Sequence, residues 1–211
     1  MSRGLKRADE HRITPRVTVS DEARRLFEEA LDLYLDAMRQ QPIEDHDKRE
    51  ERLCEARARC CRLASEAPDW VEPAELKAAV LIELGDLKHA RDHLARVIKA
   101  CASLADPEAA ECRARAFILL GQVAVEDGNY SEAQSYYERA IPAADQDGLE
   151  DYDSLEEAYD GLVSVLRELA RWNEADQVLG HGLSALERRG VTHSTLLAGQ
   201  RRILDREAAP V

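Results

Sequence analysis

The sequence has 211 residues, of which 34% are charged and only 5% aromatic, and it contains 10 Gly and 7 Pro. This composition suits long amphipathic helices better than sheets rich in β-branched and aromatic residues, so we expect an all-α protein. The net charge of -13 argues against nucleic acid as the main ligand, because binding a phosphate backbone requires a basic face.

The first segment of the chain has the opposite charge. Residues 1–16 hold five basic and two acidic side chains, a balance of about +3, which leaves about -16 for the remainder. The segment lacks a helical or strand period, so we expect residues 1–19 to form a flexible basic arm. No apolar run reaches the roughly 18 to 20 residues of a membrane span, and no secretory signal is visible, so the expected location is cytoplasmic, without membrane binding.

Hydrophobic periodicity along the rest of the chain predicts about nine helices. Their expected ranges are 21–40, 47–66, 73–84, 87–104, 107–127, 130–143, 153–169, 172–188 and 194–207. Ser20 is the expected N-cap of the first helix, and Pro73 and Pro107 fall near helix starts, where a missing N–H is harmless. Gly85 and Gly128 fall at helix ends, where a left-handed turn needs no Cβ.

Three of the breaks between helices align with one another. They begin at Gly85, Gly128 and Ala170, at spacings of about 43 and 42 residues, a period typical of solenoid repeats. Five, nine and twelve residues later the aligned positions hold Ala90, Ala133 and Ala175, then Leu94, Tyr137 and Leu179, then Val97, Ala140 and Gly182. Small residues let two antiparallel helices approach closely, and a large residue between them fills the remaining space. The pattern therefore predicts stacked helix pairs.

At these positions the sequence resembles the tetratricopeptide repeat family. The matching residues of the central repeat are Phe117, Leu120, Gly121, Gly128, Tyr130, Ala133, Tyr137 and Ala140. The repeats on either side depart from the pattern at Lys77 and Val97 and at Ala170 and Gly182. The resemblance implies a right-handed α-solenoid of antiparallel helix pairs, with repeats of about 42 residues rather than the usual ~34.

We expect one solenoid domain over residues 20–207. It would comprise a divergent N-terminal helix pair at 20–68, repeats at about 71–104, 107–143 and 153–188, and a capping helix at 193–207 with a polar outer face.

Several cysteines and histidines and one acidic loop could form metal or redox sites, but each also has a structural explanation. Cys60 and Cys101 lie on apolar helix stripes, which favours reduced, packed thiols, although a metal or redox role for Cys54, Cys60 and Cys61 stays open. His89 and His93 have a spacing that can hold a metal, yet a surface helix readily carries two histidines. In the acidic loop 145–153, Gly148 is misplaced for a calcium-binding loop. We therefore expect no metal and no cofactor.

No catalytic motif is present, so we expect a protein-binding scaffold rather than an enzyme. The resemblance assigns the groove-facing positions to the first helix of each repeat: Glu75, Ala79, Ile82 and Glu83; Arg115, Ile118, Gln122 and Glu126; Asp160, Ser164, Arg167 and Glu168. Some family members clamp a partner's terminal carboxylate with Lys and Asn, but Glu75 and Ala79 stand there in this sequence.

The acidic excess among the groove positions favours a basic or amphipathic segment of a partner protein. The alternative without a binding role is a solvated, charged face that has no ligand. A regulatory alternative is a self-assembling or autoinhibited module whose basic arm docks in the acidic groove, so self-association stays open. A third is a metal-responsive protein that uses His89 and His93 or the cysteines.

Overall fold

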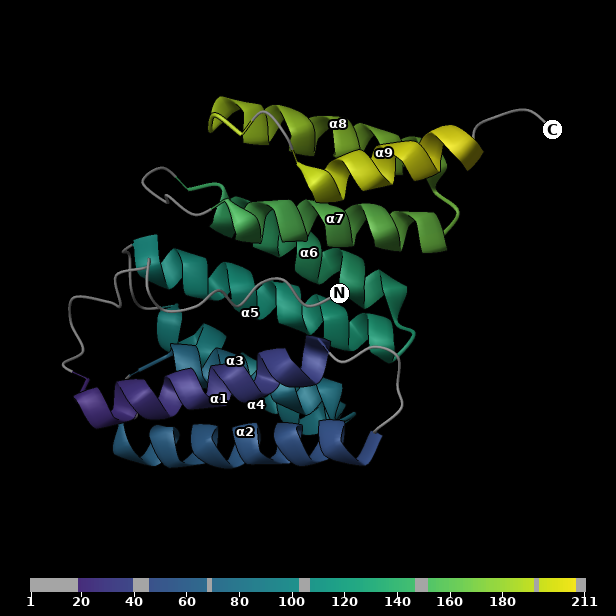
Figure 1. Cartoon of the computed structure of the whole chain (residues 1–211). Helices are drawn as coiled ribbons and strands as arrows, with labels where there is room; N and C mark the ends of the chain where they lie inside the picture. Colours follow the sequence, from purple (N-terminus) through teal and green to yellow (C-terminus); the bar gives the residue numbers. More distant parts are fainter. Residues whose placement is uncertain are drawn as a thin grey trace. The chain divides into compact units, whose positions relative to one another are not determined.

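The computed structural model describes residues 19–39, 46–67, 70–102, 107–146, 152–191 and 194–207. In these segments the chain forms nine helices and no strand. Figure 1 labels the helices along the chain. The helices are α1 (Asp21–Arg39), α2 (His46–Glu66), α3 (Glu72–Glu83), α4 (Leu87–Cys101), α5 (Pro107–Glu126), α6 (Tyr130–Ala144), α7 (Asp153–Glu168), α8 (Trp172–Arg188) and α9 (Thr195–Glu207). The all-α class is confirmed. The predicted basic arm lies outside the described residues, except for Val19, which is buried.

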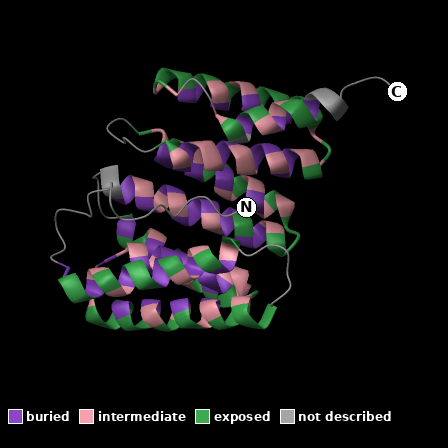
Figure 2. Ribbon diagram, viewed as in Figure 1, coloured by how far each residue is buried: buried purple, intermediate pink, exposed green. Residues whose placement is uncertain are grey.

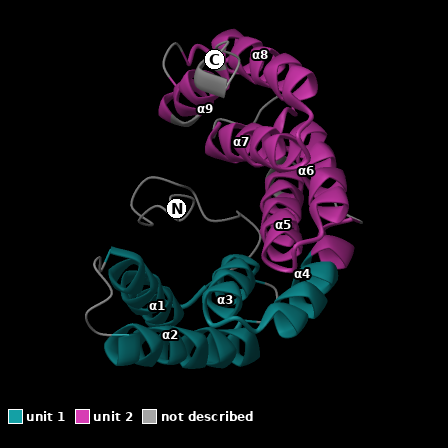
Figure 3. Cartoon of the chain, turned by 90° about the vertical axis from the view of Figure 1, so that its right-hand side faces the viewer, with its two compact units in different colours: residues 1–97 teal, residues 98–211 magenta. Residues whose placement is uncertain are grey.

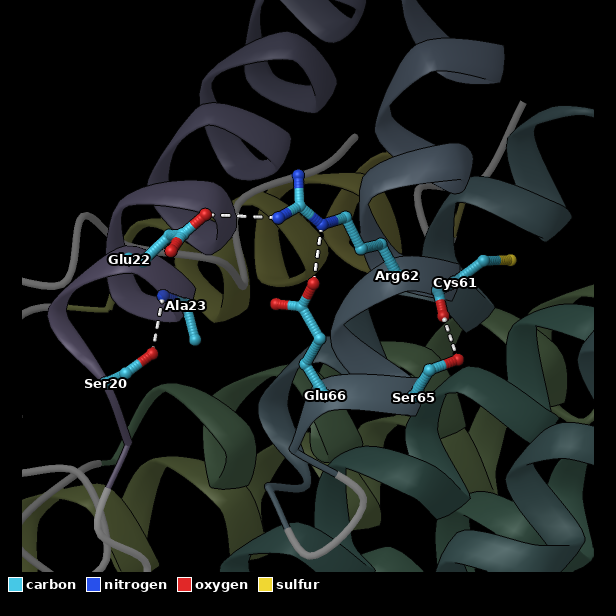
Figure 4. Close-up of polar contacts among 7 residues, drawn as sticks. All are labelled: Ser20, Glu22, Ala23, Cys61, Arg62, Ser65 and Glu66. Atoms are coloured by element: carbon cyan, nitrogen blue, oxygen red, sulfur yellow. Dashed lines mark hydrogen bonds and ion pairs between the residues drawn. The ribbon is translucent and has the colours of Figure 1, made fainter.

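Local signals set the helix starts. The Ser20 hydroxyl accepts a hydrogen bond from the Ala23 backbone N–H at 3.1 Å, which confirms the predicted N-cap of α1 (Figure 4). The Asn129 side chain accepts in the same way from the Glu132 N–H at the start of α6. Helix α5 begins at Pro107, where the absent N–H has no intrahelical role to lose.

Four helices end in the same left-handed turn. Gly85 and Gly128 both have φ +73°, Ala170 has φ +56°, and Gly190 has φ +79°. The residue after each one donates its N–H to the carbonyl five positions back, as in the bond from Asn129 to Ala124. The three aligned breaks are therefore structurally equivalent. Gly190, the fourth, joins α8 to α9 and was missed because it falls outside the 42-residue period.

The chain forms two compact units, unit 1 (residues 1–97) and unit 2 (residues 98–211), coloured separately in Figure 3. The single solenoid domain over residues 20–207, and its right-handed winding, therefore stay predictions.

Unit 1 is built on the pair α1 and α2, with α3 packed against both. Its core includes the fully buried Leu53 and Leu63 of α2. The ring centroids of Phe27 and Trp70 lie 5.0 Å apart, and Trp70 is 3% exposed. On the exposed side of the pair, the Arg62 guanidinium joins Glu22 of α1 at 3.1 Å and Glu66 of α2 at 2.6 Å (Figure 4). Such exposed ion pairs contribute little, so apolar packing provides most of the stability.

In unit 2, α5 packs against α6 and α7, and α7 also packs against α6, α8 and α9. Figure 2 shows the buried stripes along these helices. Ala133 and Ala140 are fully buried and Tyr137 is 5% exposed, which confirms the predicted small, large, small packing of α6. Burial also raises the pKa of the Tyr137 hydroxyl.

The Tyr137 ring fits between two glycines from neighbouring helices. A Cβ at Gly121 of α5 would lie 2.7 Å from the ring, and a Cβ at Gly161 of α7 would lie 2.3 Å from it. The same device recurs at Gly182 of α8, where a Cβ would lie 2.8 Å from the Tyr159 ring. Gly182, a departure from the family pattern, thus has a packing reason: it gives Tyr159 room. We call these contacts the tyrosine–glycine notches.

The surface of unit 2 carries a large apolar side chain at the start of α8. Trp172 is 41% exposed, in contrast to the buried Trp70 of unit 1.

No helix in the described segments combines the length and the apolar character that crossing a membrane requires.

Candidate protein-binding faces

The positions predicted to face a partner on α3 are mostly covered in unit 1. Glu75 and Ala79 are 3% and 5% exposed, and Ile82 and Glu83 are half-buried. The Glu83 carboxylate accepts a hydrogen bond from the Arg49 guanidinium of α2 at 2.5 Å. This contact ties the end of α3 to α2, so Glu83 has a structural partner besides any ligand.

On α5 the predicted face changes from buried to exposed along the helix. Ile118 is buried, and the half-buried Arg115 pairs with Glu111 at 2.5 Å, one turn earlier on the same helix. Gln122 and Glu126, in the last two turns, are exposed. The C-terminal half of α5 is therefore the part of this face that a partner can reach.

Helix α9 covers the middle of the predicted face on α7. Gln200 of α9, only 8% exposed, donates from Nε2 to the Asp160 carboxylate and to the Ser164 hydroxyl, both at 2.8 Å. Its Oε1 accepts from the Arg167 guanidinium at 3.1 Å. Three of the four predicted α7 positions are thus engaged within unit 2, and only Glu168 is fully exposed. Gln200 was not among the predicted residues, because a lone glutamine on an amphipathic helix gives no signal of its partners.

Three glutamates of the predicted faces share one place in the repeat: Glu83 is half-buried, and Glu126 and Glu168 are exposed. Glu83, Glu126 and Glu168 are the last helical residues of α3, α5 and α7, and each stands two positions before the left-handed residue of its turn. We call them the terminal glutamates. A helix C-terminus carries a partial negative charge, which adds to that of the carboxylate. The last turn of α5 holds no basic residue, the end of α3 is paired with Arg49, and the last turn of α7 contains Arg167, whose guanidinium donates to Gln200.

The alternative metal sites do not assemble in the described segments. His89 Nδ1 lies 2.7 Å from the Asp86 carboxylate, and His93 Nδ1 accepts from Arg96 at 3.2 Å. Burial and the nearby cations Lys77 and Arg96 lower the pKa of His93 to about 4. The described residues contain no group of three or more His, Cys, Asp or Glu side chains that could hold a metal ion. Loop residues 147–151 of the calcium alternative lie outside the described residues.

The cysteines of α2 lie in different surroundings. Cys60 is fully buried, and burial raises the pKa of its thiol to about 12. Cys61 is exposed, and Cys54 is half-buried. The three thiols therefore form no shared site on this helix.

Comparison with known proteins agrees with the repeat architecture. Residues 72–146 match the family model of the tetratricopeptide repeat, a span that includes the turns at Gly85 and Gly128. Tetratricopeptide repeats mediate protein–protein interactions, so this segment indicates a protein-interaction scaffold. None of the curated proteins matches the chain.

A solved structure supports the fold. The crystal structure of BtubC (BKLC) from P. vanneervenii is similar to this chain with a TM-score of 0.57 at 19% identity. The similarity covers 75% of this chain and 65% of that one, so this chain matches less than two thirds of that protein. At this identity the likeness shows the fold alone, an all-α helical solenoid.

Proposed function

We propose that this protein is a non-enzymatic scaffold whose terminal glutamates in unit 2, Glu126 and Glu168, recognise a basic or amphipathic segment of a partner protein. The observation that carries the proposal is the recurrence of a glutamate as the last residue of α3, α5 and α7. Within unit 2, Glu126 and Glu168 occupy the same register, each at the negative end of a helix, and so repeat a cation-attracting feature.

The reachable part of the feature lies in unit 2. Glu126 and Glu168 are exposed, and α5 packs directly against α7, so two neighbouring helices contribute one carboxylate each. Gln122, exposed one turn before Glu126, adds a hydrogen-bonding group. A Lys or Arg side chain can pair with such carboxylates, while the apolar part of an amphipathic segment would contact the adjoining helix surface.

A titration with labelled peptides tests the proposal. Fluorescence anisotropy would compare a basic and an acidic peptide of equal length, at 0.05 and 0.5 M salt, on the full chain and on the double variant Glu126→Lys, Glu168→Lys. We expect the wild type to prefer the basic peptide and to lose affinity at high salt, because the Debye length falls below about 10 Å above 0.1 M. The double variant should bind the basic peptide at least about tenfold more weakly, since it reverses both charges.

The matched control makes the same change in charge elsewhere in unit 2. The variant Glu138→Lys, Glu187→Lys reverses two exposed glutamates on the second helices α6 and α8. An equal loss in both variants would mean that net charge, not the terminal glutamates, drives binding. Glu83 is left unchanged, because its replacement would break the contact with Arg49 and confuse stability with binding.

The basic arm is the competing occupant of the same carboxylates. Deleting residues 1–16 removes about three positive charges. If the arm docks on the terminal glutamates, the deletion should raise the affinity for the basic peptide or change the oligomer size. An unchanged affinity and size would leave the arm out of the mechanism and a partner protein as the ligand.

A further inference from the structure

Two buried thiols meet between the end of α4 and the second turn of α5. The Sγ atoms of Cys101 and Cys112 lie 2.9 Å apart, and the residues are 2% and 5% exposed. The Arg113 guanidinium donates to the Cys101 carbonyl at 2.9 Å, so a second contact holds the same two turns together. Both thiols belong to unit 2.

The separation is close to that of a disulfide. It exceeds the S–S bond length of 2.03–2.05 Å by about 0.9 Å, a gap that small rotations of the two side chains can close. We propose that Cys101 and Cys112 are a redox modification site, which forms an intramolecular disulfide when the protein meets a peroxide.

The chemistry balances with hydrogen peroxide as the oxidant. The thiolate of one cysteine attacks the O–O bond, which gives a sulfenic acid and, after proton transfer, one water. The second thiol attacks the sulfenic sulfur and displaces its hydroxyl as another water. The two thiols together lose two electrons and two protons, and the peroxide is reduced to two waters. A small oxidant suits the site, because burial excludes bulky ones.

The other cysteines lack this arrangement. Cys60 is buried with a pKa of about 12, whereas its neighbour Cys61 faces outward on the same helix. A metal site at Cys101 and Cys112 is disfavoured, since no third His, Cys, Asp or Glu in the described segments completes a ligand set with them. The pair is therefore placed to form a disulfide rather than a metal site.

The bond would close a ring of residues 101–112. Such a cross-link restricts the unfolded chain, so oxidation should raise the melting temperature of the protein by about 5 °C. Reduction with dithiothreitol should reverse the rise.

The sequence makes the bond easy to detect. Residues 100–113 contain no internal Lys or Arg, so both cysteines fall in a single tryptic peptide. Cys54 falls in the peptide 53–57, and Cys60 and Cys61 fall in the peptide 60–62. The folded, full-length protein would be exposed to hydrogen peroxide, unfolded, alkylated with N-ethylmaleimide and digested. We expect the peptide 100–113 to lose about two mass units and to carry no maleimide.

Variants separate the pair from the exposed thiol. In Cys112→Ala and in Cys101→Ala, peroxide should no longer raise the melting temperature, whereas Cys61→Ala should behave like the wild type. The proposal is overturned if the wild-type peptide 100–113 carries two maleimides while the peptide 60–62 is oxidised. It is equally overturned if the rise in melting temperature persists in Cys112→Ala. The mass measurement needs no variant, so it decides even where a substitution prevents folding.

Discussion

The connection from α3 to α4 and the connection from α5 to α6 have the same type of turn. They differ in the size of the buried residue nine positions after the turn glycine. Both turns have a glycine at φ +73°, and both second helices place alanine five residues after it, at Ala90 and Ala133. Nine residues after the glycine, however, α4 has Leu94 and α6 has Tyr137, both buried. The larger ring requires Gly121 and Gly161 opposite it. The same backbone turn therefore accommodates either residue, because the larger Tyr137 ring is offset by the missing Cβ atoms of two glycines.

The largest effect should come from emptying the tyrosine–glycine notch. We expect Tyr137→Ala to lower the free energy of unfolding by about 3 to 5 kcal/mol, because it leaves a cavity that two glycines cannot fill. Urea unfolding followed by circular dichroism would measure it. The half-buried neighbour Tyr136 is the control, and its replacement by alanine should cost about 1 kcal/mol or less. Similar losses at both positions would contradict the notch.

Overfilling the notch should cost less than emptying it. Gly161→Ala places a Cβ 2.3 Å from the Tyr137 ring, so we expect a loss of about 1 to 3 kcal/mol. In a Tyr137→Leu background, which mimics α4, the same change should cost much less, and a double-mutant cycle would measure the difference. Gly180→Ala is the control, since nothing lies within 4 Å of its added Cβ. An equal cost in both backgrounds would show that the ring is not the obstacle.

Lowering the pH should reduce the stability of the protein through His93 of α4. His93 stands eight residues after the glycine of its turn, a position that Tyr136 occupies in α6. Its pKa is about 4 when folded against 6.5 when unfolded, so below pH 6.5 the unfolded chain binds a proton that the folded one rejects. Stability is therefore lost as the pH falls from 6.5 towards 4, by about 1 to 2 kcal/mol after allowing for partial exposure.

The measurement for His93 compares urea unfolding at pH 7 and pH 5 in the wild type and in His93→Gln. The variant should lose less stability over this range than the wild type, because it has no imidazole to protonate. If His93→Gln and the wild type respond equally, His93 does not cause the sensitivity.

The smallest effect concerns the turn itself. Ala170 has φ +56°, a conformation that glycine adopts without strain, so Ala170→Gly should stabilise the protein by up to about 1 kcal/mol. The reciprocal change Gly128→Ala should destabilise it by about 1 kcal/mol. Melting temperatures of the two variants would test both signs, and a destabilising Ala170→Gly would mean that the turns are not equivalent.

The helices and turns were predictable because their signals are local. Ser20, Gly85 and Gly128 act within one helical turn of their own positions, and the repeat spacing located the third break even though alanine occupies it. The notch at Gly182 was not predictable, since it depends on which face of α7 presents Tyr159.

The candidate faces were predictable only in part. The family pattern assigned the candidate positions to α3, α5 and α7, and this assignment stays a prediction. Glu126 and Glu168 are exposed on these helices. The pattern could not foresee that Gln200, 40 residues after Asp160, engages the middle of α7. Contacts over such a separation depend on how α9 packs against α7, which a short sequence pattern does not predict.

The two tryptophans of the chain provide a separate optical reporter for each unit. Trp70 is buried against Phe27 in unit 1, so its emission should be blue-shifted in the folded state and move to longer wavelength when that unit unfolds. Trp172, already 41% exposed in unit 2, should change far less. Intrinsic fluorescence would then follow unit 1, while circular dichroism follows all nine described helices. Coincident denaturation curves would show that the two units unfold as one cooperative system, and an earlier fluorescence transition would show that unit 1 opens first.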